Sequence, residues 1–192
     1  MKQNAAHVES PICIILAAGR GTRMRSQTRH KACFPISGRP AILRALDSYT
    51  AAGLSNFHVV VGALAGQVME TVTAEYPQAT FVYQAEQRGT GHAARVAVEP
   101  LVTMGYTGPV LITMGDKLIE PEAVRKLIRT FREGEYAAII GVLPRQPKSS
   151  GGRVLLRADG SLAGIVEARD IQRAVALFHT FQEAAAASEL TA

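Results

Sequence analysis

Tryptophan is absent from this 192-residue sequence, and aromatic residues make up only 6% of it. Proteins that bind single-stranded nucleic acid stack bases on aromatic side chains, so this composition argues against such a partner. Only two cysteines are present, which is too few for a disulfide framework or a four-cysteine metal site. We interpret Cys13 and Cys33 as packing residues of a protein in the reducing cytoplasm.

Long apolar runs are also missing. The run at residues 11–18 is too short to span a membrane, and the ten residues before it have no signal-peptide pattern. We therefore predict a cytoplasmic protein without membrane contact. The length suits one core, and we expect one α/β domain over residues 11–170, between a tail at 1–10 and a helical tail at 171–192.

Acidic residues are absent between Pro11 and Leu46, although the whole chain has a net charge of only +5. The basic residues in that stretch are Arg20, Arg23, Arg25, Arg29, Lys31, Arg39 and Arg44. Such a concentration of cations on one loop and its flanks is typical of a site for a small polyanion. A nucleic acid would require a longer basic track, so only the charge favours that alternative.

Strands alternate with helices along most of the chain. Short apolar runs predict strands at residues 12–16, 57–61, 80–83 and 110–114. Apolar residues at helical spacing predict helices at residues 40–52, 65–75, 92–104 and 121–133. This alternation predicts a Rossmann-like α/β fold, with a mostly parallel sheet covered by helices on both faces. Its ligand crevice lies at the carboxyl ends of the strands.

The pattern changes after Glu135. The elements expected there are a strand at 136–143, a hairpin of residues 153–157 and 161–167 around Ala158-Asp159-Gly160, and a helical tail at 170–192. On that tail we expect Phe178 and Phe181 to lie on a buried face.

The sequence LAAGRGTRM, residues 16–24, has a glycine turn directly after the first strand. Gly19 and Gly21 allow a tight turn whose N–H groups point at anionic oxygens. The motif has neither the GK[ST] of a Walker A loop nor the third glycine of a dinucleotide fingerprint. A plain strand-to-helix turn is the alternative, but a turn alone needs no cations, so Arg23 and Lys31 favour phosphate binding.

Four ordered stretches, spanning residues 12–170, resemble the sugar-1-phosphate nucleotidyltransferases. The similarity is greatest to the N-acetylglucosamine-1-phosphate uridyltransferase (UDP-N-acetylglucosamine pyrophosphorylase) domain. The stretches are LAAGRGTRM followed by Lys31 and FPISGRPAI, QAEQRGTGHAAR at 84–95, LITMGDKLIEP at 111–121, and GGRVLLRADGSLAGIVEARD at 151–170. The resemblance implies nucleotidyl transfer from a nucleoside triphosphate, expected to be UTP, to a sugar 1-phosphate, expected to be N-acetylglucosamine 1-phosphate. Pyrophosphate is the implied second product.

The resemblance also assigns roles to single residues. It implies nucleotide binding by Leu16, Ala17, Ala18, Gly19, Gly21, Thr22, Gln84, Gln87, Gly89 and Thr90. It implies Arg23 and Lys31 as catalytic cations, Asp116 as the ligand of an Mg²⁺ cofactor, and Gly152 and Glu167 as sugar-binding residues. Plainer roles are open for two of these residues, because Thr90 can cap a helix and Glu167 can be a solvated hairpin residue. We expect His92 on a helix face rather than in acid–base catalysis.

Several features depart from the family pattern. His30 stands where the family usually has a proline before the lysine, in a loop with one additional residue. Lys117 follows Asp116 where uridyltransferases have a small or apolar residue. The family's Asn-Thr-Gly and a later asparagine are not recognisable after Glu167, so we expect an incomplete sugar half, in a compact or truncated relative. Two alternatives stay open: a nucleotide or nucleotide-sugar binding module without turnover, and a molybdopterin-type cytidylyltransferase, which shares the LAAG opening.

Overall fold

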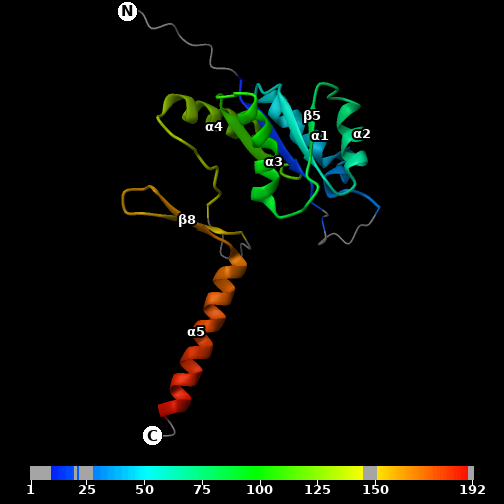
Figure 1. Ribbon diagram of the computed structural model, residues 1–192. Helices are drawn as coiled ribbons and strands as arrows, with labels where there is room; N and C mark the ends of the chain where they lie inside the picture. The colour runs from blue at the N-terminus through cyan, green and yellow to red at the C-terminus, as the bar shows by residue number, and fades with distance from the viewer. Residues whose placement is uncertain (1–9, 20, 22–27, 145–150, 190–192) are drawn as a thin grey trace, which may run out of the picture. The chain divides into compact units, whose positions relative to one another are not determined.

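The computed structural model describes residues 10–19, 21, 28–144 and 151–189 (Figure 1). The chain forms two compact units, unit 1 over Met1–Ala137 and unit 2 over Ala138–Ala192. In its described residues, unit 1 contains a parallel sheet flanked by α-helices, and unit 2 contains a hairpin and an α-helix. None of the described helices combines the length and the apolar character that crossing a membrane requires.

Four parallel strands form the sheet of unit 1. They are β1 (Ile12–Ala17), β4 (Phe57–Val61), β5 (Thr80–Tyr83) and β6 (Val110–Met114), in the order β5-β4-β1-β6. Each lies where the sequence predicted a strand, and β1 extends one residue further than predicted. The register pairs Ile15 of β1 with Val59 on one side and with Thr113 on the other. The predicted Rossmann-like sheet is confirmed.

Helices connect the strands at the predicted places. They are α1 (Ala41–Ala51), α2 (Ala65–Thr73), α3 (Thr90–Thr103) and α4 (Pro121–Glu133). Their ends differ from the predicted ends by two residues at most. The start of α4 is set by Pro121 at its first position, where the missing proline N–H costs no helix hydrogen bond.

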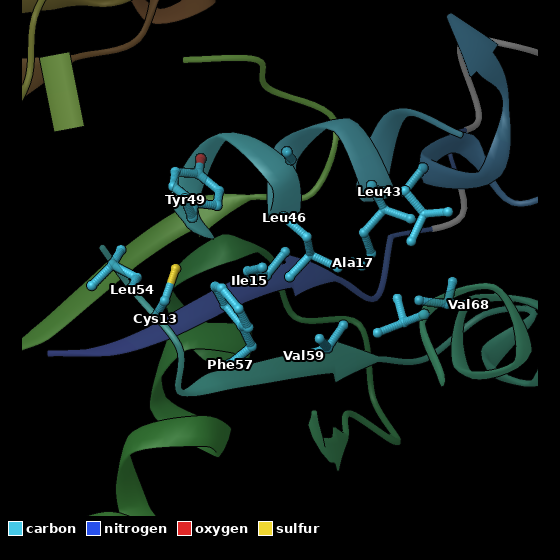
Figure 2. Close-up of a cluster of buried hydrophobic side chains, with 14 of the residues drawn as sticks. Cys13, Ile15, Ala17, Leu43, Leu46, Tyr49, Leu54, Phe57, Val59 and Val68 are labelled. Atoms are coloured by element: carbon cyan, nitrogen blue, oxygen red, sulfur yellow. The ribbon is translucent and has the colours of Figure 1, made fainter. Parts of the chain in front are cut away.

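Side chains of β1 alternate between two apolar clusters. Cys13, Ile15 and Ala17 pack with residues of α1, α2 and α4 (Figure 2), whereas Ile14 and Leu16 pack on the other face with α3. Because both faces are covered, β1 is a continuous apolar run rather than an alternating one. Burial raises the pKa of the Cys13 thiol to about 12, so Cys13 is a packing residue, as predicted.

A small hairpin of β2 (Pro35–Ile36) and β3 (Arg39–Pro40) precedes α1. Arg39 ties this hairpin to both neighbouring helices. Its Nε donates to Asp47 of α1 over 2.6 Å, and its two terminal nitrogens donate to Glu75, just beyond α2, over 2.9 and 2.7 Å. The Arg39 guanidinium holds the pKa of the Asp47 carboxyl below its ordinary value. The hairpin of β2 and β3 is therefore fixed to α1 and to the end of α2.

Unit 2 contains the predicted hairpin and tail helix. Strands β7 (Arg153–Leu156) and β8 (Leu162–Val166) pair antiparallel, and α5 (Ala168–Glu189) follows. The turn between the strands uses Gly160 at a φ of +81°, and the Asp159 carboxylate accepts from the Ser161 N–H over 2.9 Å. The hairpin turn that the Ala-Asp-Gly sequence predicted is therefore present, with glycine in the left-handed conformation and the aspartate side chain bonded to the turn backbone.

The predicted strand at residues 136–143 does not form. This segment pairs with no strand in the described part of the chain, and its apolar side chains are exposed, up to 92% for Leu143. An apolar run becomes a strand only where another strand forms hydrogen bonds with its N–H and C=O groups. The apolar composition alone gave the wrong prediction.

The expected burial of Phe178 on α5 is also wrong, because its side chain is 60% exposed. A two-stranded hairpin and one helix offer too little apolar surface to enclose the aromatic side chains of that helix. The side chain of Phe181 lies outside the described residues.

We expect Tyr49→Phe to lower the free energy of unfolding by about 1–2 kcal/mol. The Tyr49 hydroxyl and the Thr113 hydroxyl form a buried hydrogen bond of 2.6 Å between α1 and β6, and the variant leaves Thr113 without that partner. Urea unfolding followed by circular dichroism measures the change. Tyr83→Phe, at an exposed tyrosine on β5, is the control. Equal losses of unfolding free energy in Tyr49→Phe and Tyr83→Phe would contradict a specific role for the buried Tyr49–Thr113 hydrogen bond.

Candidate functional site

The candidate site lies at the carboxyl ends of the four parallel strands. The chain leaves β1 toward β4 on one side, whereas β6 lies on the other side of β1. Adjacent strands whose connections run in opposite directions leave a crevice between them, which is where α/β sheets bind ligands. Ala18 and Gln84 follow directly on β1 and β5, and Asp116 is the second residue after β6, so the predicted residues from three stretches gather at this edge.

The backbone ends of β1, β4 and β5 approach each other closely at Gly62. A Cβ atom on Gly62 would lie 2.8 Å from the Ala18 carbonyl oxygen and 3.2 Å from the Gln84 carbonyl oxygen. The Ala63 N–H donates to the same Ala18 oxygen over 3.2 Å. Only glycine fits here, and the ends of three strands meet between the predicted base-binding stretches. Sequence reasoning missed Gly62, although a glycine directly after a buried strand is a signal for such an approach.

Gln84 and Gln87 are brought to this edge of the sheet by different contacts. The Gln87 amide donates to the Ala18 carbonyl oxygen over 2.9 Å, so it links the loop after β5 to the end of β1. Gln84 is buried, and its amide nitrogen lies 2.9 Å from Nδ1 of His92. Because an amide nitrogen only donates, His92 Nδ1 accepts this bond and the ring proton lies on Nε2. His92 is a helix-face residue, as expected, and it orients Gln84.

The turn before α3 requires glycine. Gly89 has a φ of +96°, and α3 begins directly after it at Thr90. Thr90 is thus the first residue of the helix and not its cap, and no side chain accepts a hydrogen bond at the Gly89 cap position. The alternative role of Thr90 as a helix cap is wrong. No side chain therefore caps the first N–H groups of α3, which lie at the positive end of the helix dipole.

Lys31 and Asp116 form an ion pair beside the glycine turn. Lys31 opens a short 3-10 helix, η2 (Lys31–Cys33), and Asp116 follows β6. A Cβ on Gly21, which has a φ of +62°, would lie 3.0 Å from the Lys31 Cβ, so the turn packs against the lysine stem. The Lys31 side chain is 44% exposed and that of Asp116 is 18% exposed, which leaves the lysine amine accessible to a ligand.

His30 and Gln67 form hydrogen bonds next to Lys31, and sequence reasoning missed both contacts. The His30 ring is buried and lies 3.1 Å from the Gly19 carbonyl oxygen. The His30 backbone N–H donates to the Gln67 side chain of α2 over 2.9 Å. A histidine in a basic loop gives no sequence signal for burial, because burial here depends on the packing of α2 against that loop.

Several predicted residues lie elsewhere or outside the described chain. Arg23 and Thr22, like Arg20 and Arg25, are outside the described residues. Arg39 and Arg44 serve the fold, since Arg39 binds two carboxylates and the Arg44 Nε donates to the Ile36 carbonyl oxygen over 2.6 Å. The predicted polyanion site thus has fewer cations than the sequence count suggests.

Gly152 and Glu167 are brought together within unit 2. A Cβ on Gly152 would lie 3.0 Å from the Val166 carbonyl oxygen and 3.7 Å from the Glu167 Cα. Gly152 therefore lies against the end of β8, with Glu167 exposed beside it. Sugar binding by this pair stays a prediction.

The sheet has a glycine turn after its first strand and amide side chains after β5. An ion pair joins Lys31 to Asp116, which follows β6. These features define a nucleotide-binding α/β domain. The chain belongs to the family of MobA-like NTP transferase domains, which matches residues 13–183. It is therefore a nucleotidyltransferase-family protein.

Individual relatives agree with this assignment. The chain is 38% identical over 160 residues to the bifunctional protein GlmU of Gloeobacter violaceus, a match that covers 82% of this chain and 34% of that protein. The chain thus spans about a third of the length of the curated relatives it matches.

Two solved structures support the fold. One is a Bacillus anthracis protein in complex with sucrose, with a TM-score of 0.63, 15% identity and coverage of 83% of this chain and 65% of that chain. The other is a nucleotidyl transferase from Methanothermobacter thermautotroptrophicus, with a TM-score of 0.51 and 20% identity. The match covers 63% of this chain and 57% of that chain.

We expect Gly62→Ala to destabilise the protein and to weaken nucleoside triphosphate binding. The added methyl group would meet the Ala18 carbonyl oxygen at 2.8 Å, so β1 and β4 must separate at the site. Gly66→Ala on α2 is the matched control, since a Cβ there meets no atom within 4 Å and alanine favours a helix. Thermal unfolding and calorimetric titration with Mg·UTP measure both effects. A Gly62→Ala protein as stable as the Gly66→Ala protein would contradict the close approach.

Proposed function

We propose that this chain transfers a uridylyl group from UTP to N-acetylglucosamine 1-phosphate and releases pyrophosphate. The observation that carries the proposal is the Lys31–Asp116 ion pair beside the glycine turn, because it joins a cation and a carboxylate at the ligand-binding edge of the sheet. The choice of substrates rests on the four ordered motifs shared with the uridyltransferases, and the identity with GlmU supports it.

The nucleoside is proposed to bind at the carboxyl end of β1, beside Leu16, Ala17, Ala18 and Gly62. The Gln87 amide nitrogen is engaged by Ala18, and the Gln84 amide nitrogen by His92. In the described residues no group donates to the Gln84 amide oxygen, which can therefore accept from the N–H of a base. Main-chain groups at Gly89 and Thr90 complete the recognition of a uracil edge.

The triphosphate is proposed to bind along the glycine turn, from Gly19 through Gly21 and Thr22 to Arg23. Gly21 has the left-handed conformation that lets consecutive N–H groups face an anion. The planar guanidinium of Arg23 suits the β- and γ-phosphates because it can bind two oxygens at once. Lys31 would then contact the oxygens around the α-phosphorus.

Asp116 is the proposed ligand of an Mg²⁺ ion. In the described residues no cluster of three or more His, Cys, Asp and Glu side chains could hold a metal ion. An Mg²⁺ ion that is held mainly by substrate phosphates needs only one or two carboxylates, and the Asp116 carboxylate already faces a cation, the Lys31 amine. The donor set fits such an ion, which supplies Lewis-acid stabilisation of phosphoryl charge when bound.

The proposed reaction requires no protein nucleophile. An oxygen of the sugar 1-phosphate forms a bond to the α-phosphorus of UTP, and the bond to the β-phosphate oxygen breaks, with pyrophosphate as the leaving group. The chain's own contribution is to hold the two anions in line and to neutralise the charge on the phosphoryl oxygens. Lys31 performs the second task. Gly152 and Glu167, both in unit 2, are proposed to bind the sugar.

Pyrophosphate release by the purified chain tests this function. The assay combines each common nucleoside triphosphate with a panel of sugar 1-phosphates, with and without Mg²⁺. Release that requires UTP, N-acetylglucosamine 1-phosphate and Mg²⁺ would establish the proposal. Triphosphate binding without release would instead favour the binding module, and release with CTP alone would favour the cytidylyltransferase.

We expect Asp116→Asn to lower the rate of Mg²⁺-dependent pyrophosphate release by at least about 100-fold. The amide cannot replace the charged metal ligand, metal-based charge stabilisation is worth several kcal/mol, and about 1.4 kcal/mol corresponds to a factor of ten. Glu120→Gln, at an exposed carboxylate four residues away, is the control and should keep the wild-type rate. A wild-type rate for Asp116→Asn would exclude Asp116 as the metal ligand.

A further inference from the structure

His30 links the glycine turn to the turn that carries Lys31. Its imidazole is only 3% exposed, which is unusual for a residue of a loop rich in basic side chains. Nδ1 accepts from the Ala32 N–H over 3.2 Å, within the η2 turn of Lys31. On the other side of the ring, Nε2 lies 3.1 Å from the Gly19 carbonyl oxygen. One side chain thus joins the two parts of the proposed phosphate site.

These two contacts define one state of the ring. Because Nδ1 accepts from an N–H group, it carries no proton, and the proton of the neutral ring lies on Nε2. Nε2–H then donates to the Gly19 carbonyl oxygen. The imidazole is neutral, in a single tautomer, with both nitrogens engaged.

The backbone at His30 is anchored as well. Its φ of −66° is the angle that a proline ring fixes, and its ψ of 140° is extended. Its N–H donates to the Gln67 Oε1 over 2.9 Å, and the Gln67 amide donates to the Thr28 carbonyl oxygen over 2.5 Å. His30 therefore has a backbone conformation that a proline could adopt, and it adds bonds that a proline cannot form.

We propose that His30 is a positioning residue for Lys31: its imidazole couples the glycine turn to η2 and so holds the Lys31 amine at Asp116, where the reacting phosphate would bind. This role rests on the proposed function and deepens it. The bridge through His30 joins the Gly19 carbonyl directly to η2 and so restricts the position of Lys31 relative to Gly19. Lys31 itself has a long, half-exposed side chain, so its placement depends on a fixed backbone beneath it.

Acid should break this coupling. A proton added to Nδ1 would face the Ala32 N–H, donor against donor. Burial, first of all, holds the pKa of His30 below its ordinary value of 6.5, and the Lys31 charge acts in the same direction. The Gly19 carbonyl and the Asp116 charge oppose the shift, and Gln67, from α2, is neutral. The unfolded state therefore binds the proton more readily, and the stability that His30 contributes falls as the pH drops below that ordinary value.

Three variants separate the contacts of His30. His30→Asn keeps an acceptor near the position of Nδ1, and His30→Gln keeps a donor near the position of Nε2. His30→Pro permits the same φ while removing both ring bonds and the backbone N–H bond to Gln67. We expect kcat for pyrophosphate release to fall about 10- to 100-fold in each variant, because a displacement of about 1 Å can cost a factor of 100. The KM for UTP should change less than kcat. His58→Gln, at a half-buried histidine near the amino end of β4, is the control and should keep the wild-type kcat.

A double-mutant cycle tests whether His30 acts through Lys31. In a Lys31→Ala background, His30→Gln should lower kcat no further, because the group that it positions is already absent. Equal losses of kcat with and without Lys31 would overturn the proposal. A wild-type kcat in His30→Pro would also overturn it, since backbone conformation alone would then suffice.

Nitrogen NMR tests the same role without turnover. The long-range ¹H–¹⁵N spectrum should assign the Nε2–H tautomer to His30, and the ¹⁵N signal of the Lys31 amine should shift in His30→Gln. An unchanged lysine signal would overturn the positioning role. If the wild-type chain releases no pyrophosphate with any substrate while the lysine signal does shift, the proposed function fails and the positioning of Lys31 stands.

Discussion

Complete burial of β1 is the constraint on which the rest of the molecule depends. None of its six residues is more than 7% exposed, and its two edges pair with β4 and β6. A strand covered on both faces and paired on both edges cannot slip by one residue without exchanging the two sets of core side chains. The position of Ala18 and of the glycine turn beyond it therefore follows from the packing of Cys13, Ile15 and Ala17 (Figure 2).

The site combines such rigid positions with loops that are tied down by single polar contacts. Gly62 follows directly on β4, and Asp116 is the second residue after β6, so their places are set by the sheet. Gln87 lies on the loop before α3 and Lys31 opens η2, and a hydrogen bond to Ala18 and an ion pair with Asp116 hold these two side chains at the strand ends. The division has a physical reason: a ligand-binding loop must open to admit its ligand, and contacts of modest strength allow this opening.

Most of unit 1 was predictable from sequence because its elements are short, strongly periodic and bounded by turn residues. The strand bounds of β4, β5 and β6 and the full extent of α4 agree with the prediction. The error at residues 136–143 has a different origin, since strand formation there depends on a partner that composition does not reveal. Burial of His30 and the close approach at Gly62 were unpredictable for a related reason: both arise where segments distant in sequence meet.

Roles of the predicted site residues were harder to infer than their location. The motif at residues 84–95 indicated a cluster at the strand ends, and the structure brings Gln84 and Gln87 there. It did not indicate that His92 orients Gln84, because a histidine at a helix start is equally common as a surface residue. The count of basic residues was misleading in the same way, since Arg39 and Arg44 are engaged by carboxylates and carbonyl groups of the fold.

The close approach at Gly62 has an evolutionary consequence. Any residue larger than glycine at this position would meet the Ala18 and Gln84 carbonyl oxygens, so the position cannot vary without moving the strand ends. Under the proposed function, a change in the choice of nucleoside falls to the surrounding loops, where Gln84 and Gln87 have side chains that can be exchanged while the sheet is kept. A duplicated copy of such a domain can therefore acquire a new substrate by a few changes in one loop, at little risk to its folding.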